Sequence, residues 1–250
     1  MTKFVAFVSG KGGVGKTTVT LNTGHSLAKQ GKSVTLLDGN LVTPNLAIHL
    51  GMVDPQGTLN KFLRKELQLN EIIYAHDSGF NVIPASPDYS EFLKTNPQQV
   101  SKVFKGLENT ADYILVDAPS GLGYDLSSLL KNCDEVVIVA NPTLTSVMDA
   151  LKSMQLAKAH NVTVAGVVLN MTNRGRHELN ENEVYEILGH PIIANIRTQR
   201  KVRKSLHKKQ PASMLYPRSR LSKEFTKIAN HISHEEFLIK GWDIKKKSNC

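Results

Sequence analysis

Seven short runs rich in Val, Ile and Leu recur along the chain, and they restrict the fold more than any other feature. Most of them are continuously apolar, and segments of helical character separate most of them. Strands that are apolar on both faces are typical of a parallel sheet with helices on each side. We therefore predict an α/β fold, with a mostly parallel twisted sheet covered by helices on both faces. The predicted strands cover residues 4–8, 34–37, 80–84, 113–116, 136–140, 164–169 and 192–196.

Length and composition favour one large domain. The chain has 250 residues, of which 40% are hydrophobic and 21% charged, and this excludes fibrous and mostly disordered chains. No apolar run reaches the roughly eighteen residues of a membrane-spanning helix, and the N-terminus lacks a signal-peptide pattern. The two cysteines, Cys133 and Cys250, are too few for a disulfide framework or a zinc site. We expect a cytoplasmic protein with one domain over residues 1–236 and a distinct basic tail over residues 237–250.

A glycine-rich loop directly follows the first predicted strand. Residues 10–18 read G-K-G-G-V-G-K-T-T and match the phosphate-loop pattern G-x-x-x-x-G-K-[ST] between a strand and a helix. The glycines let backbone N–H groups turn toward a phosphate, and the helix dipole adds to the same positive field. Lys16 is expected to bridge the β- and γ-phosphates, and the Thr17 hydroxyl is expected to ligate Mg²⁺. The expected nucleotide-binding residues here are Gly10, Lys11, Gly12, Gly13, Val14, Gly15, Lys16, Thr17 and Thr18.

A carboxylate follows the predicted strand at residues 113–116. Phosphate-loop sites hold Mg²⁺ partly through waters bound to an acidic group, and Asp117 supplies that group. Residues 118–123 read A-P-S-G-L-G, and we predict a flexible loop suited to sensing the γ-phosphate. A strand-end Asp alone is a weak signal, but it becomes strong together with the phosphate loop.

The extra lysine in the loop, Lys11, resembles the deviant Walker A motif of the MinD/ParA ATPase family. Residues 37–51, 117–122 and 167–170 extend the resemblance, and residues 38–46 are most similar to MinD-like members, particularly archaeal ones. The resemblance implies a P-loop NTPase that hydrolyses ATP to ADP and phosphate with Mg²⁺. It also implies that Lys11 reaches the partner's ATP across a homodimer, where a second cation would stabilise charge on the γ-phosphoryl group. A solvated loop lysine is the alternative.

One departure from the family pattern concerns hydrolysis. The family usually has Asp-x-Asp after the second strand, with the second carboxylate orienting the attacking water, and this chain has Asp38-Gly39-Asn40. Asn40 cannot take up a proton, although its carbonyl can still orient a water. We predict slow hydrolysis, with Asp38 as a candidate for the water or the Mg²⁺ shell. A scaffold that binds ATP and barely turns it over stays open as an alternative.

Two residues are expected near the base, one from the resemblance and one at a second departure from the family pattern. Asn170 follows the predicted strand 164–169, at the position where the family's Asn reads the purine edge. An amide suits adenine, and residues 170–173 offer no carboxylate for guanine, which favours ATP over GTP. A helix-cap or turn role for Asn170 is the alternative. After the last predicted strand, residues 196–199 read I-R-T-Q where the family usually has Ile-Pro-x-Asp, and Arg197 could stack on the base.

The net charge of +9 is confined to the C-terminal quarter. Residues 191–250 hold 15 Lys and Arg against 4 Asp and Glu, a net of +11, whereas residues 1–190 hold 16 against 18, a net of −2. A predicted helix at residues 200–209 places Val202 and Leu206 on one side. The segment from Arg197 to Lys209 contains several Lys and Arg residues and no Asp or Glu. This pattern favours an anionic partner, although solvated helix faces of this kind are common.

The tail at residues 237–250 combines bulky apolar groups, including Trp242, with lysines. It resembles the short membrane-interface helix at the C-terminus of MinD-like proteins, although Gly241 interrupts it. Two tails on an ATP-bound dimer would bind a membrane more tightly than one. We therefore expect a switch ATPase at the inner membrane face that positions division, motility or chemosensory machinery, with a protein activator or cargo. A ParA-like ATPase that partitions cargo on nonspecifically bound DNA is the alternative, as is a disordered or docked tail.

Overall fold

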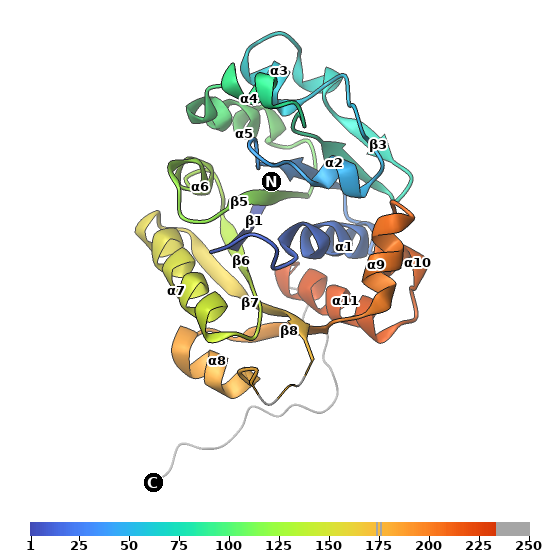
Figure 1. The fold of residues 1–250 in the computed structure, drawn as a ribbon. Coiled ribbons are helices and arrows are strands. Elements are labelled where there is room, and N and C mark those ends of the chain that lie inside the picture. Colours follow the sequence, from blue (N-terminus) through green and yellow to red (C-terminus); the bar gives the residue numbers. More distant parts are fainter. Residues whose placement is uncertain (174, 176, 234–250) are drawn as a thin grey trace.

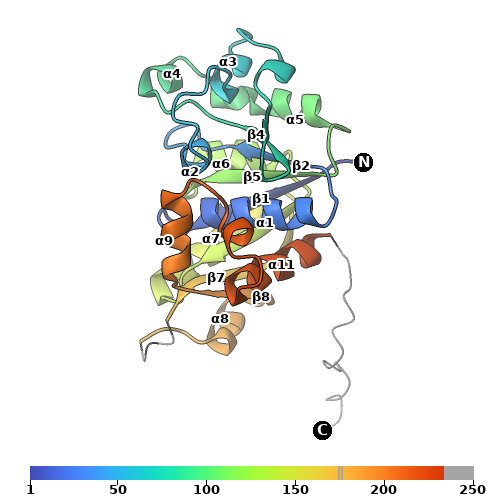
Figure 2. The same cartoon turned by 90° about the vertical axis from the view of Figure 1, so that its right-hand side faces the viewer.

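A twisted eight-stranded sheet lies between two layers of helices in the computed structural model, which describes residues 1–173, 175 and 177–233 (Figure 1, Figure 2). The strand order is β3-β4-β2-β5-β1-β6-β7-β8, and every pair is parallel except β3 with β4. The strands are β1 (Lys3–Ser9), β2 (Val34–Asp38), β3 (Tyr74–His76), β4 (Phe80–Ile83), β5 (Tyr113–Ser120), β6 (Glu135–Ala140), β7 (Thr163–Thr172) and β8 (Ile192–Arg197). The predicted parallel sheet is thus confirmed, and the tail at residues 237–250 lies outside the described residues.

All seven predicted strands are present, with three corrections. The edge strand β3 was not predicted, because its sequence Tyr-Ala-His contains no apolar run. Strand β5 continues through Ser120, so the predicted loop at residues 118–123 is wrong at its start, and Asp117 lies inside the strand. Strand β7 continues to Thr172, so Asn170 lies within it and not after it.

The helices cover both faces because the strands alternate between two hydrophobic cores. In β1, Phe4, Ala6 and Val8 pack into one core, and Val5 and Phe7 pack into the other. The first core includes residues of α3 (Leu59–Leu63), α5 (Ser101–Leu107), α6 (Tyr124–Leu130), α7 (Leu144–Ala159) and α8 (Glu181–Leu188). The second includes residues of α1 (Lys16–Lys29), α2 (Leu46–His49), α10 (Ala212–Leu215) and α11 (Arg220–Ile232). The chain also forms the short helix α4 (Tyr89–Leu93) and two 3₁₀ turns, Leu69–Glu71 and Pro97–Val100.

Two helix ends follow from the backbone conformation of the residues after them. Helix α1 ends before Gly31, whose φ of 82° only glycine adopts readily. The predicted helix at residues 200–209 is α9 (Arg200–His207), and it ends earlier because Lys209 takes a left-handed φ of 56°. In the part of the chain that the structure describes, no helix has both the length and the apolar character needed to cross a membrane.

Candidate nucleotide site

One buried carboxylate gathers the two side chains that the motif assigns to phosphate and metal. Lys16 Nζ lies 2.7 Å from Asp117 Oδ1, and the Thr17 hydroxyl donates to Asp117 Oδ2 at 2.6 Å. Lys16 and Asp117 are only 6% and 1% exposed. A buried charge persists only when it is paired and hydrogen-bonded, and this arrangement supplies both. The structure therefore brings three predicted site residues together at the carboxyl edge of the sheet.

Three of the four glycines of the phosphate loop are required, by their backbone conformation, by close contacts or by both. Gly13 and Gly15 have φ values of 80° and 89°, in the left-handed region that disfavours other residues. A Cβ on Gly10 would lie 2.4 Å from Asp149 Cβ on α7, and a Cβ on Gly15 would lie 2.2 Å from Asn170 Nδ2. Positions 12 and 13 face open space. The loop is thus packed at its two ends and open in its middle.

Lys11 is exposed beside this open middle. Its backbone carbonyl accepts a hydrogen bond from the Ser9 hydroxyl at 3.1 Å, which ties the start of the loop to β1. The side chain is therefore accessible from outside the protomer. Its reach to a partner's nucleotide stays a prediction.

Asp38 organises the loop that follows β2. It is fully buried and stands opposite Asp117 in the β2–β5 register. Its carboxylate accepts backbone N–H groups from Asn40 and Asn45 at 3.1 Å each and from Leu46 at 3.0 Å. Burial raises the pKa of Asp38, and the negative charge of Asp117 raises it further. Asp38 therefore shapes the chain next to the site, and its role toward water or Mg²⁺ stays a prediction.

The Asn40 amide is held within the same loop. Its Nδ2 donates to the Thr43 carbonyl at 2.8 Å and to the Thr43 hydroxyl at 3.0 Å, and its Oδ1 accepts from Thr43 N at 3.1 Å. The side chain is 7% exposed. In this arrangement Asn40 closes a turn, and its water-orienting role stays a prediction.

Asn170 contacts the phosphate loop. Its Nδ2 donates to the Val14 backbone carbonyl at 2.7 Å, and the Asn170 backbone carbonyl accepts from Asn141 Nδ2 at 3.0 Å. Its position inside β7 rules out the helix-cap and turn alternatives. Arg197 is the last residue of β8 and is half-buried. Base recognition by both residues stays a prediction.

Sequence reasoning missed the residues that support the loop from α7 and from the β6–α7 connection. Asn141 follows the β6 strand at the same sheet edge as Asp117, and Asp149 packs against Gly10. A polar residue directly after a buried parallel strand is the signal that could have identified Asn141. Nothing local in the sequence marks Asp149, because its contact is made mostly by its backbone and Cβ.

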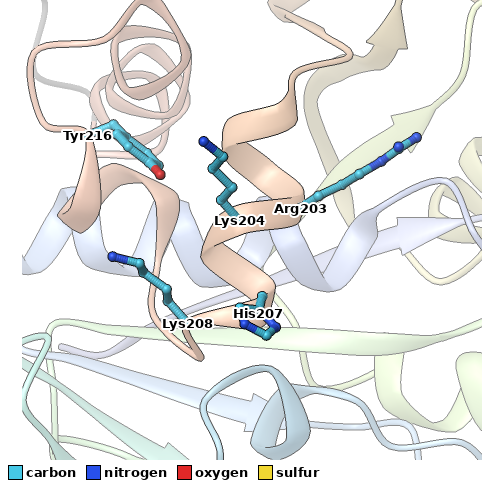
Figure 3. A pocket seen from close by; sticks show the side chains of 5 residues that line it. All are labelled: Arg203, Lys204, His207, Lys208 and Tyr216. Atoms are coloured by element: carbon cyan, nitrogen blue, oxygen red, sulfur yellow. The ribbon is translucent and has the colours of Figure 1, made fainter.

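A second feature is a basic pocket beside α9. Helix α9 docks through buried Ser205 and half-buried Val202 and Leu206, which confirms the predicted apolar side. The outer surface borders a cavity of about 500 Å³. Arg203, Lys204, His207, Lys208 and Tyr216 line it, and Lys204 and Lys208 extend toward the side on which Tyr216 lies (Figure 3). Lys201 Nζ lies 5.5 Å from the centroid of the Tyr216 ring. Among the described residues, no ion pair joins an α9 cation to a carboxylate.

The first site fits the expected cofactors, ATP and Mg²⁺. The glycine loop leaves room where side chains would intrude, and a buried lysine, a hydroxyl and a carboxylate form the donor set at its end. Thr17 and Asp117 would hold the metal, and Lys16 and the loop would hold the phosphates. Bound Mg²⁺ neutralises charge on the phosphate oxygens.

Comparison with known proteins agrees with this geometry. The sequence model described as "ParA: NUBPL iron-transfer P-loop NTPase" matches residues 1–233. An uncharacterized ATP-binding protein of Methanocaldococcus jannaschii is 30% identical over 225 residues, which cover 90% of this chain and 85% of the relative.

Three solved structures share the fold over most of both chains. The cell division ATPase MinD of Pyrococcus furiosus has a TM-score of 0.89 at 32% identity, covering 94% of this chain and 100% of that chain. The septum site-determining protein MinD of Pyrococcus horikoshii, complexed with Mg-ADP, has a TM-score of 0.89 at 30% identity, with coverage of 93% and 96%. The MinC:MinD complex of Aquifex aeolicus has a TM-score of 0.84 at 25% identity, with coverage of 96% and 99%.

These likenesses confirm the resemblance to MinD-like and ParA-like proteins that the motifs indicated. The chain therefore belongs to the ParA family of P-loop NTPases.

Proposed function

We propose that this protein is a MinD-like switch ATPase, which dimerises with Mg-ATP and returns to the monomer after hydrolysis. The observation that carries the proposal is the buried cluster of Lys16, Thr17 and Asp117 at the end of a glycine loop that also presents an exposed lysine. A chain that only bound nucleotide would need the cluster but not the accessible cation. Lys11 is the group that a second copy could use.

Each part of the nucleotide site has a separate proposed role in binding or hydrolysis. Lys16 and the backbone N–H groups of the loop bind the phosphates, while Thr17 and Asp117 hold the metal. Lys11 of a second copy stabilises the charge that develops on the γ-phosphoryl group, which ties hydrolysis to dimerisation. The Asp38–Asn40 loop orients the attacking water, and Asn40 makes this step slow because it cannot accept a proton.

The basic surface of α9 and the tail are the proposed route to an anionic membrane. Each exposed cation near an anionic leaflet contributes about 1 kcal/mol, and two copies in a dimer double the number of contacts. A peripheral position at the inner membrane face follows, where the ATP-bound dimer would recruit cargo or an activating protein. The complex of MinC with MinD in Aquifex aeolicus supports a protein partner of this kind.

DNA is the second candidate for the anionic surface. The basic pocket favours it, because no acid in the described chain pairs with the α9 cations and phosphate contacts would satisfy them. A ParA-like partitioning ATPase would then result. A scaffold with negligible turnover is the third candidate, and the bonds between Asn40 and Thr43 favour it.

Iron transfer, which the description of the matching family names, has less support. Iron–sulfur clusters are held by several cysteine thiolates. The sequence has only Cys133 and Cys250, and burial raises the pKa of the Cys133 thiol, so that the thiolate is disfavoured.

Co-sedimentation separates these candidates. The full chain and a variant ending at residue 236 are pelleted with anionic phosphatidylglycerol vesicles or with DNA, in Mg-ATP and in Mg-ADP. ATP-dependent pelleting with vesicles that needs the tail supports the MinD-like proposal. DNA pelleting that fades with salt and ignores the tail supports the ParA-like one. ATP binding without turnover, even with lipid or DNA present, supports the scaffold.

A matched pair of charge variants locates the surface. Lys204→Glu with Lys208→Glu reverses two cations that line the pocket, whereas Lys102→Glu with Lys105→Glu reverses two exposed cations on α5. The proposal expects the first pair to lose anion binding and the second to keep it. Equal losses would mean that only net charge matters.

A further inference from the structure

The site of interest is a β-bulge that turns a buried amide toward the phosphate loop. In the β7–β8 register, Asn170 stands opposite Ile196 and Thr172 stands opposite Arg197, which leaves Met171 without a partner. Met171 has a left-handed φ of 59°, a costly conformation for a residue with a side chain. Bulges of this kind redirect neighbouring side chains and occur often beside active sites.

The Asn170 amide packs directly on the loop backbone. Its Nδ2 lies 2.7 Å from the Val14 carbonyl oxygen, and Asn170 and Val14 are only 6% and 1% exposed. The same Nδ2 would be 2.2 Å from a Cβ on Gly15, so the glycine is what allows this approach. The amide thus contacts two consecutive residues of the phosphate loop.

The surrounding residues hold Asn170 in place. Asn141 Nδ2 donates to the Asn170 backbone carbonyl at 3.0 Å, and the Asn141 backbone N–H donates to the Ser146 hydroxyl at 3.0 Å. Near the other end of the loop, Gly10 lies against Asp149 of α7. The loop is therefore supported at both ends from the side of β6, α7 and β7.

This contact has a consequence for phosphate binding. A trans peptide is planar, so its C=O and N–H point in opposite directions. Fixing the Val14 carbonyl toward Asn170 therefore directs the Gly15 N–H away from Asn170. A phosphate loop works only when its N–H groups face the ligand and its carbonyls face elsewhere.

We propose that Asn170 is a positioning residue that contributes to nucleotide affinity through the shape of the phosphate loop. This inference rests on the proposed nucleotide-binding function, and it changes the expected role of Asn170 from reading the purine to ordering the triphosphate site. Removing the amide lets the Val14–Gly15 peptide rotate. Affinity for the phosphates falls even when no base is present.

The test compares two ligands that differ in the base. The full chain is titrated calorimetrically with Mg-ATP and with Mg-tripolyphosphate, which has no base or ribose. Asn170→Ala is expected to raise the Kd of both ligands by the same factor, about tenfold for one buried hydrogen bond. Asn132→Ala is the matched control: it also removes an amide that donates to a backbone carbonyl, that of Ser128 at 2.9 Å, but it lies before the start of β6, and it leaves the Kd for tripolyphosphate unchanged.

Hydrogen exchange supplies a readout that needs no ligand. In the nucleotide-free chain, Asn170→Ala is expected to accelerate amide exchange within residues 10–18. If Asn170→Ala does not fold, Asn170→Asp keeps the side-chain shape, places a carboxylate against the Val14 carbonyl, and weakens tripolyphosphate binding at least tenfold.

The outcomes separate the inference from the proposed function. Weaker ATP binding with unchanged tripolyphosphate binding and unchanged exchange would overturn the inference, because Asn170 would then read only the base. A parent protein that binds neither ligand would overturn the proposed function itself.

Discussion

Three alanine substitutions in the phosphate loop separate backbone strain from steric contact. Gly12 has no atom within 4 Å of an added Cβ and is not among the residues with positive φ. Gly13 has the same open space but a φ of 80°, and Gly15 combines a φ of 89° with a 2.2 Å approach to Asn170 Nδ2. The three positions therefore form a graded series within four residues of chain.

The expected losses in the free energy of unfolding follow from these differences. Gly12→Ala should change stability by less than about 0.5 kcal/mol. Gly13→Ala should cost about 1 kcal/mol, because a Cβ disfavours the left-handed region. Gly15→Ala should cost about 2–3 kcal/mol, because it adds the displacement of Asn170 and the loss of its hydrogen bond to Val14.

Urea unfolding of the nucleotide-free chain, followed by circular dichroism, measures these values. In an Asn170→Ala background, the cost of Gly15→Ala should fall to that of Gly13→Ala, because the contact is already gone. Equal losses at all three positions would refute the reasoning, as would an unchanged cost of Gly15→Ala in the double variant.

Three other predictions concern chemistry and metal. Asn40→Asp should accelerate single-turnover ATP hydrolysis because a carboxylate can accept the proton of water; a rate equal to the parent's would show that Asn40 does not limit turnover. Asp117→Ala should destabilise the nucleotide-free chain by about 3 kcal/mol, measured by urea unfolding, since it leaves Lys16 buried without its partner; a loss below about 1 kcal/mol would contradict a tight buried pair. Chelation of Mg²⁺ with EDTA should weaken ATP binding to the parent protein, as measured by fluorescence titration. The same treatment should change ATP binding to Asp117→Ala little, and equal effects on both proteins would argue against Asp117 as a group that holds the metal.

The sheet and the phosphate site could be predicted because local sequence encodes them. The apolar runs place the strands, and the loop pattern fixes which residues meet near Asp117. The edge strand β3 could not be predicted, since antiparallel pairing with β4 and not apolar content defines it. The extension of β5 past Asp117 similarly depends on pairing between Ser120 and Ser9.

The hydrogen-bond partners of Asn40 and Asn170 could not be predicted from the sequence, for a different reason. An amide offers both a donor and an acceptor, so its residue type does not select a partner. Asn40 forms hydrogen bonds with Thr43 in its own turn. Asn170 donates to the Val14 carbonyl from a strand that contains a bulge at Met171. Both choices depend on backbone geometry that forms only in the folded chain.

The central claim is that ATP makes this protein dimerise through Lys11. Sedimentation velocity of the full chain with Mg-ATP and with Mg-ADP tests it most directly, with Lys11→Ala as the comparison. The account predicts a dimer with Mg-ATP, a monomer with Mg-ADP, and a monomer in both nucleotides for Lys11→Ala despite retained ATP binding. A parent protein that stays monomeric with bound Mg-ATP, or a Lys11→Ala variant that dimerises as the parent does, would contradict it.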